Sequence, residues 1–235
     1  MQWISASGTH PGNVRGRNED AVFCSSKMQL WAVADGMGGH NAGDYASEKI
    51  AQGLAQVELV ADLSESVDRI EDCLYEINDH LRYHAKANCQ GQTVGSTVVV
   101  LVTQGSVGVV LWAGDSRLYQ LRKRELRLIT RDHNPVADLL DVGEVTEQQA
   151  MNADTHVITR AIGGALDLHL DVAVFDVLAG DTFMLCSDGL YREVETEVVS
   201  DALKHDACVA VETLMDAVLA GQAKDNVSLV VAKAT

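Results

Sequence analysis

The sequence predicts an α+β layered sandwich, in which long helices pack on mostly antiparallel sheet. Two observations predict it. Short runs rich in β-branched and aromatic residues are bounded by turns, and two pairs of segments carry apolar residues at helical spacing. Along the chain the order is strands, two helices, many strands, two helices and a last strand.

Strands are expected in the runs that combine β-branched and aromatic residues. These runs are Ile4–Thr9, Ala21–Ser25, Leu30–Ala34, Thr97–Thr103, Val107–Ala113, Arg117–Arg122, Leu126–Thr130, Leu168–Asp176, Thr182–Cys186 and Val227–Ala232. The basic stretch Arg122-Lys123-Arg124-Glu125 joins two of them, so we expect a solvated hairpin tip there. Trp3, Trp31 and Trp112 lie in or beside these runs and are expected to pack in the core.

Helices are expected where apolar residues recur every three or four positions. The first pair is Gly43–Val60 and Ser66–Ala87, the second of which Ser64 or Ser66 is expected to cap. A second pair, Glu197–Leu203 and Ala207–Leu219, lies near the end of the chain. The polar region from Pro135 to Thr155 is less regular, and we expect a short helix followed by a mobile loop.

The chain is expected to form one domain over residues 1–235. Its apolar residues, 47% of the total, suffice for one large core. Only two prolines occur, Pro11 and Pro135, and no Ser/Gly-rich stretch or run of one charge divides the sequence. We therefore expect neither a linker nor an internal repeat.

The charge balance narrows the possible partners. Asp and Glu number 34 against 18 Lys and Arg, which gives a net charge of −16. This argues against nucleic-acid binding, because a phosphate backbone needs clustered basic side chains to displace its counterions. No apolar run approaches the roughly 20 residues of a membrane span, and Met1–Ser5 lacks the basic flank of an export signal. We expect a cytoplasmic monomer with no membrane partner.

The five cysteines are odd in number and scattered, without a CxxC motif. This pattern favours buried thiols in a reducing compartment over a disulfide framework. They are Cys24, Cys73, Cys89, Cys186 and Cys208.

Aspartates stand where apolar strands are expected to begin or end. They are Asp20, Asp35, Asp115, Asp188 and Asp225. One Asp-Gly pair alone is typical of a tight turn. Several aspartates at strand ends indicate more than turns, because strand ends can meet at one edge of a sheet. Carboxylates that meet there repel one another unless cations neutralise them. An oxygen-only cluster suits Mg²⁺ or Mn²⁺ rather than zinc, and Gly36 would let a backbone carbonyl approach such an ion.

Arg15 is a candidate phosphate ligand. It lies in Arg15-Gly16-Arg17-Asn18-Glu19-Asp20, just before one of the aspartates, and a guanidinium beside a metal-bound carboxylate can bind phosphate. The alternative is a surface arginine paired with Glu19. The glycine-rich stretch from Asp35 to Gly43 lacks the Gly-Lys-Ser/Thr of a Walker loop and indicates a metal-site turn instead.

Eight ordered segments together resemble one known family. They are Arg15…Asn18-Glu19-Asp20, Val33-Ala34-Asp35-Gly36-Met37-Gly38-Gly39-His40, Gly95-Ser96-Thr97, Ala113-Gly114-Asp115-Ser116-Arg117, Thr130-Arg131-Asp132-His133-Asn134, Ile158-Thr159-Arg160-Ala161-Ile162-Gly163, Cys186-Ser187-Asp188-Gly189-Leu190 and Asp225-Asn226-Val227. Their order resembles the motifs of the metal-dependent protein phosphatases, the PP2C or PPM family, in their bacterial form. The resemblance runs from about Gly8 to Val231.

The resemblance implies a four-layer α-β-β-α sandwich, with two central antiparallel sheets flanked by helix pairs, and a flap-like segment at about residues 135–160. It also implies hydrolysis of phosphoserine and phosphothreonine on proteins with two, in some relatives three, Mn²⁺ or Mg²⁺ ions. The chain would oppose a bacterial Ser/Thr kinase.

The resemblance further implies the roles of single residues. Asp35 would bridge two metals, the Gly36 carbonyl would hold one of them, and Asp188 and Asp225 the other. Asp20 would contact water at the metals, and Asp115 with Asp188 would hold a third, weaker metal. Arg15 would bind the phosphate, so that Asp35, Asp188 and Arg15 form the catalytic set.

The sequence departs from the family pattern at one position. Many eukaryotic members carry a His directly after the Asp-Gly pair, as a proposed general acid, where this chain has Met37. His40 is the nearest histidine and is expected to act as a structural hydrogen-bonding group. Asp132 is expected to stabilise the flap, and Thr159 to lie where the flap returns to the core.

Two other readings stay open on the sequence alone. One is a metal-dependent phosphoesterase of small molecules, and the other is a catalytically silent binding module with a phosphatase fold. His80 and His84 have the helical i, i+4 spacing that can bind zinc. They are expected to be a surface pair, because the sequence offers no third zinc ligand near them.

Overall fold

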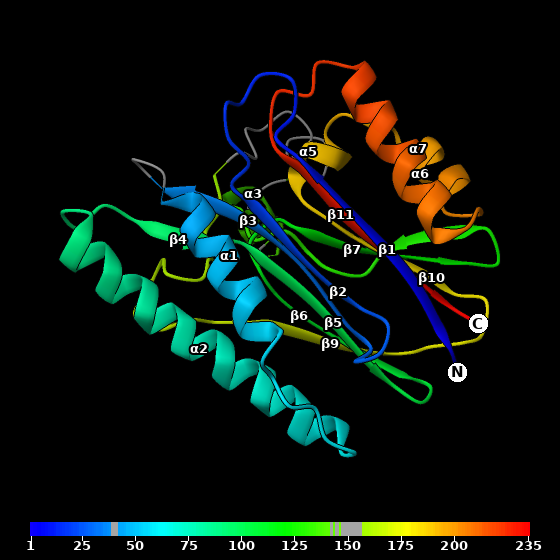
Figure 1. Cartoon of the computed structure of the whole chain (residues 1–235), viewed down its shortest axis with the longest axis horizontal. Coiled ribbons are helices and arrows are strands. Elements are labelled where there is room, and N and C mark those ends of the chain that lie inside the picture. Colours follow the sequence, from blue (N-terminus) through cyan, green and yellow to red (C-terminus); the bar gives the residue numbers. More distant parts are fainter. Residues whose placement is uncertain (39–41, 142, 144–145, 147–156) are drawn as a thin grey trace.

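Two antiparallel sheets lie face to face and helices cover both outer faces, which confirms the α+β sandwich (Figure 1). The computed structural model describes residues 1–38, 42–141, 143, 146 and 157–235. Figure 1 places one helix pair on either side of the strands. The layers therefore follow the order helix, sheet, sheet, helix.

Each sheet is built from strands that pair antiparallel with their neighbours. The five-stranded sheet has the order β1 (Trp3–His10), β11 (Val227–Ala234), β10 (Thr182–Cys186), β7 (Arg117–Arg122) and β8 (Glu125–Leu128). The six-stranded sheet has the order β2 (Asp20–Ser25), β3 (Leu30–Gly38), β5 (Val98–Gln104), β6 (Val107–Ala113) and β9 (Asp171–Asp176), and β4 (Val94–Ser96) pairs with the end of β3.

A pair of helices covers each sheet. Helices α1 (Gly43–Leu54) and α2 (Leu63–Asn88) pack on the six-stranded sheet, while α6 (Thr196–Ala202) and α7 (Ala207–Ala220) pack on the five-stranded sheet. Two short helices, α3 (Pro135–Asp141) and α5 (Asp188–Tyr191), follow β8 and β10.

The layer between the sheets holds the tryptophans, as the sequence predicts. Trp3, Trp31 and Trp112 are buried there with Phe183. The ring centroids of Trp3 and Trp31 lie 4.8 Å apart, and those of Trp3 and Phe183 lie 6.0 Å apart. These aromatic contacts bury large apolar areas and join the two sheets into one core.

Several element boundaries differ from the sequence-based expectation. Helix α1 ends at Leu54 instead of Val60, because the backbone turns away there. The cap of α2 is Asp62 rather than Ser64 or Ser66, since the Asp62 carboxylate accepts a hydrogen bond from the Glu65 N–H at 3.1 Å. Neither β4 nor α5 was expected; β4 pairs with β3, and α5 contacts β11 and α7.

The hairpin tip between β7 and β8 is confirmed. Lys123 and Arg124 adopt φ values of 49° and 72°, the left-handed conformation of a tight hairpin turn. Lys123, Arg124 and Glu125 are exposed, as expected of a solvated tip, while the Arg122 guanidinium at its base pairs with the buried Asp181 carboxylate at 2.6 Å.

The five cysteines are all free, but the expectation that they are buried holds only for Cys186. Cys208 is exposed and the other three are half-buried.

Within the described residues, no helix is both long and apolar enough to cross a membrane.

Candidate metal and phosphate site

The predicted aspartates gather at one end of the sandwich. Asp20 begins β2 and lies directly opposite Asp35 of β3 in the strand register. Asp115 follows β6, Asp188 begins α5, and Asp225 precedes β11. All but Asp20 line one cavity of about 340 Å³ together with Arg15 and Gly36. The expectation that β3 stops before Asp35 is wrong, because pairing with β4 carries the strand on to Gly38.

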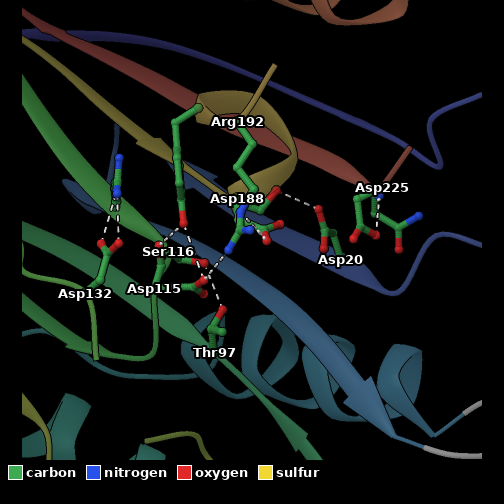
Figure 2. A network of polar contacts seen from close by, with 12 residues as sticks. Asp20, Thr97, Asp115, Ser116, Asp132, Asp188, Arg192 and Asp225 are labelled. Atoms are coloured by element: carbon green, nitrogen blue, oxygen red, sulfur yellow. Dashed lines mark hydrogen bonds and ion pairs between the residues drawn. The ribbon is translucent and has the colours of Figure 1, made fainter. Parts of the chain in front are cut away.

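The backbone of Asp35 is held on both sides by the segment that follows β4. The Asp35 N–H donates to Thr97 Oγ1 at 3.1 Å, and the Thr97 N–H donates to the Asp35 carbonyl at 2.9 Å. The Ser96 hydroxyl donates to the same carbonyl at 2.9 Å. Thr97 Oγ1 in turn lies 2.8 Å from Ser116 Oγ, beside Asp115 (Figure 2). These bonds fix the Asp35 backbone at the cavity that this residue lines.

Gly36 is required for a reason that the sequence did not reveal. A Cβ atom at this position would lie 2.1 Å from the Gly43 carbonyl oxygen and 2.4 Å from that of Glu19. The Gly36 N–H also donates to the Glu19 carbonyl at 3.0 Å. Three backbone segments therefore meet at Gly36, and only a residue without a side chain fits between them.

Asp20 is anchored through one carboxylate oxygen. The Ser187 hydroxyl donates to Asp20 Oδ2 at 2.9 Å, and it accepts a hydrogen bond from the Ser228 N–H at 3.0 Å. Asp20 Oδ1 is buried and has no hydrogen-bond partner within the residues that the structure describes. Such an oxygen is costly unless a cation or water satisfies it.

Arg15 faces the cavity from the loop between β1 and β2. Its Nη2 atom lies 3.0 Å from Asp225 Oδ2, so the partner is Asp225 rather than Glu19. The next residue, Asn226, holds the loop: its Oδ1 accepts from the Glu19 N–H at 2.8 Å, and its Nδ2 donates to the Arg17 carbonyl at 2.8 Å. The loop that carries Arg15 is thereby tied to the start of β11.

The carboxylates of the cluster strongly perturb one another. Burial, followed by the charge of Asp20, raises the pKa of Asp35 well above its ordinary value. Burial also raises the pKa of Asp20 to about 7 and that of Asp115 to about 6, with Asp188 adding to both. Without further cations, the cluster therefore holds more negative charge than its surroundings stabilise.

We predict that the metal-free protein loses stability as the pH rises. The raised pKa values of Asp20 and Asp115 mean that the folded state binds more protons than the unfolded chain, whose Asp pKa is 3.8. The free energy of unfolding should therefore fall as the pH rises from about 4 through about 7, the range between the unfolded and folded pKa values. The measurement is Tm in EDTA at about pH 5 and about pH 7.5.

The control for this pH series is Asp35→Asn, which removes one charge from the cluster and should flatten the decline. Excess Mn²⁺ should abolish most of the decline in Tm with pH. A Tm in EDTA that stays level or rises over the same range would contradict the electrostatic description of the cluster.

The donor set fits a hard divalent cation. It consists of carboxylate and carbonyl oxygens, of which Asp20 Oδ1 is buried without a hydrogen-bond partner in the described part of the chain, and oxygen ligands suit Mg²⁺ and Mn²⁺. Within the same described residues, no three His, Cys, Asp or Glu side chains yet surround a common point as they would around an ion. Arginines instead contact the carboxylates of Asp225, Asp188 and Asp115.

The residues expected around the flap occupy different places. Asp132 lies away from the cavity lining and accepts two hydrogen bonds from the Arg117 guanidinium, at 2.8 and 2.9 Å (Figure 2). Thr159 lines an adjoining cavity of about 400 Å³, whose lining shares Met37 and Ile158 with the aspartate cavity. His40, and most of the segment at 142–156, lie outside the described residues.

His80 and His84 form a surface cluster with Tyr45 instead of a metal site. The Tyr45 hydroxyl lies 2.6 Å from His80 Nε2, and the Tyr45 ring stacks on His84 with centroids 4.3 Å apart. This arrangement agrees with the expectation of a surface pair.

Arg192 is the charged residue at the site that the sequence reasoning missed. Its Nε lies 2.9 Å from Asp188 Oδ2, and its Nη2 lies 3.3 Å from Asp115 Oδ2 (Figure 2). The available signal was the i, i+4 spacing from Asp188, which places the two side chains on one face of a helical turn.

Comparison with known proteins points to one family. A family model described as protein phosphatase 2C matches residues 9–227, a range that contains all the predicted site residues. The serine/threonine phosphatase stp of Listeria welshimeri is 35% identical over 204 residues, which cover 83% of this chain and 81% of the relative.

Solved structures agree in fold. PppA of Pseudomonas aeruginosa, described as a key regulatory component of T6SS, has a TM-score of 0.92 at 39% identity, with 100% of this chain and 99% of that chain covered. The catalytic domain of the serine/threonine protein phosphatase PstP, solved in complex with two manganese ions, has a TM-score of 0.85 at 32% identity, with 99% and 98% covered.

Proposed function

The chain belongs to the protein phosphatase 2C family and is thus a metal-dependent serine/threonine phosphatase, and from this premise we propose that it dephosphorylates proteins with two divalent cations held at the aspartate cluster. The observation that carries the proposal is the meeting of Asp35, Asp188 and Asp225 in one cavity. The raised pKa of Asp35 supports it, because crowded carboxylates favour the binding of cations.

In this proposal the aspartates hold the metals and Arg15 holds the substrate. Asp35 would hold both ions, the Gly36 carbonyl oxygen would hold one of them, and Asp188 and Asp225 would hold the other. When bound, two Mn²⁺ or Mg²⁺ ions would supply an activated water and neutralise charge on the phosphoryl oxygens. Asp115 with Asp188 offers a third, weaker position.

Asp20 and Arg15 orient the water and the substrate in this proposal. Asp20, fixed by the Ser187 hydroxyl, has a second carboxylate oxygen free of described protein partners to accept a hydrogen bond from water. Arg15 is 56% exposed at the cavity and exchanges its contact with Asp225 for the substrate phosphate, to which a guanidinium donates two parallel hydrogen bonds.

Arg15→Ala is expected to weaken phosphate binding more than turnover. KM for a phosphothreonine peptide should rise about tenfold or more while kcat falls less, because a lost charge-assisted hydrogen bond costs about 1.5–3 kcal/mol. Arg15→Lys should recover part of the loss. Steady-state kinetics with saturating Mn²⁺ measure both constants, and an unchanged KM in Arg15→Ala would remove Arg15 from the phosphate site.

The cellular setting belongs to the same proposal. We propose that residues 1–235 act as a single phosphatase domain, with a flap at about 135–160, and as a cytoplasmic monomer. Its substrates are phosphorylated proteins, and it reverses a bacterial Ser/Thr kinase. The family's curated members named as serine/threonine phosphatases support the substrate class.

Rates on two substrates test the proposed substrate class. With Mn²⁺, kcat/KM for a phosphothreonine peptide should exceed that for a nucleotide phosphodiester by at least about 100-fold, since the two are discriminated by transition-state binding. Similar rates on both would favour the small-molecule phosphoesterase. A folded chain that hydrolyses neither would favour the silent binding module.

A further inference from the structure

Arg192 joins the two carboxylates that are expected to hold the third metal. It follows the last residue of α5, and its N–H donates to the Asp188 carbonyl at 3.1 Å. This turn returns its side chain to Asp188 itself, whose Oδ2 lies 2.9 Å from Arg192 Nε. Arg192 Nη2 lies 3.3 Å from Asp115 Oδ2. Figure 2 shows the guanidinium between the two carboxylates.

The surroundings of Arg192 keep it in this position. The side chains of Arg192, Asp188 and Asp115 are only 24%, 17% and 7% exposed, so water screens their charges little. The Tyr191 hydroxyl donates to the Asp115 carbonyl at 3.1 Å. The loop after β6 is therefore joined to α5 by two consecutive residues.

A second interaction supports the Tyr191 ring. The Arg117 guanidinium carbon lies 3.6 Å from the ring centroid, and Asp132 holds that guanidinium with two hydrogen bonds. A cation over an aromatic ring is attracted by the ring quadrupole. The position of Arg192 is thus part of an ordered network and not that of an unconstrained surface side chain.

We propose that Arg192 is a tethered cation that occupies the position between Asp115 and Asp188, so that a third metal ion binds there only by displacing it. The proposal rests on the proposed function, which places metals at this cluster. A guanidinium keeps its charge at every ordinary pH, and two cations cannot share a position a few ångströms wide without strong repulsion. Arg192 therefore favours the two-metal state of this chain.

Counting bound Mn²⁺ tests the proposal without an activity assay. The metal-stripped full chain is titrated with Mn²⁺, and free Mn²⁺ is followed by electron paramagnetic resonance for wild type and Arg192→Gln. The variant should bind a third ion with a Kd at least about tenfold lower than wild type, since removing one charge a few ångströms away relieves more than 1.4 kcal/mol of repulsion.

Two further variants serve as controls. Arg69→Gln removes the same charge from an exposed ion pair with Glu65 on α2, outside the other sheet, and should leave the third Kd unchanged. Arg192→Lys keeps the charge and should stay close to wild type. If Arg192→Lys bound the third ion as tightly as Arg192→Gln, the charge would not be the cause and the proposal would fail.

The possible outcomes separate this inference from the proposed function. If Arg192→Gln has two tight Mn²⁺ sites and an unchanged third Kd, the role proposed for Arg192 is overturned, and the proposed function still stands. A wild-type chain that binds no Mn²⁺ would overturn the metal-dependent function and, with it, this inference. Should Arg192→Gln not fold, wild type decides by itself: a third ion bound as tightly as the first two would overturn the proposal.

Discussion

Asp35→Asn is expected to lower kcat on a phosphothreonine peptide by at least about 10³-fold, because it removes the carboxylate proposed to bridge two metals and to organise the charged transition state. The same change should leave the metal-free fold intact and raise its Tm in EDTA. Asp35 lies opposite Asp20 in the β2–β3 register, and its pKa is raised well above the ordinary value, so a neutral amide relieves repulsion there.

The combination of lost activity and retained or increased stability distinguishes a metal ligand from a structural residue. Asp201→Asn is the matched control, since it removes one charge at an exposed position on α6. It should leave both kcat and the Tm in EDTA close to their wild-type values. Wild-type turnover in Asp35→Asn, measured with saturating Mn²⁺, would rule out the two-metal proposal.

Gly36→Ala is expected to destabilise the metal-free protein by about 3 kcal/mol, at the upper end of the cost of overpacking. The added Cβ atom would lie 2.1 and 2.4 Å from the carbonyl oxygens of Gly43 and Glu19. Both are backbone atoms, so the start of α1 or the loop carrying Arg15 must move. Denaturant unfolding in EDTA measures this cost separately from metal binding.

Gly16→Ala provides the comparison for Gly36→Ala. A Cβ atom at Gly16 has nothing within 4 Å and no left-handed backbone to strain, so its stability should stay within about 0.5 kcal/mol of wild type. Equal stabilities of the two variants would show that the close approach at Gly36 is readily relieved.

Local patterns were enough to predict the layers and most of the candidate site. Apolar periodicity placed the two helix pairs. The aspartates at expected strand ends do meet at one cavity, apart from Asp20, which is buried and accepts a hydrogen bond from Ser187. Local patterns carry no information about which distant segment a strand pairs with. Asp35 lies inside β3 because β4, a three-residue strand some 60 positions away, pairs with the residues after it.

The same limit explains the residues that were missed. Asp62 caps α2, although Ser64 and Ser66 are equally good caps by type, because only the path of the chain decides which residue precedes the first turn. Arg192 has no motif of its own, and its role depends on the fold bringing Asp115 next to α5. Gly36 was expected for a metal, whereas the structure requires it for backbone packing as well.

Metal-dependent catalysis at the aspartate cluster is tested by phosphate release from a phosphothreonine peptide by the purified chain, with Mn²⁺ and then with excess EDTA, beside Asp188→Ala. We expect release that needs Mn²⁺, stops in EDTA and is lost in the variant. Release that continues in EDTA, or that Asp188→Ala retains, would contradict a phosphatase that works through metals held by the aspartate cluster.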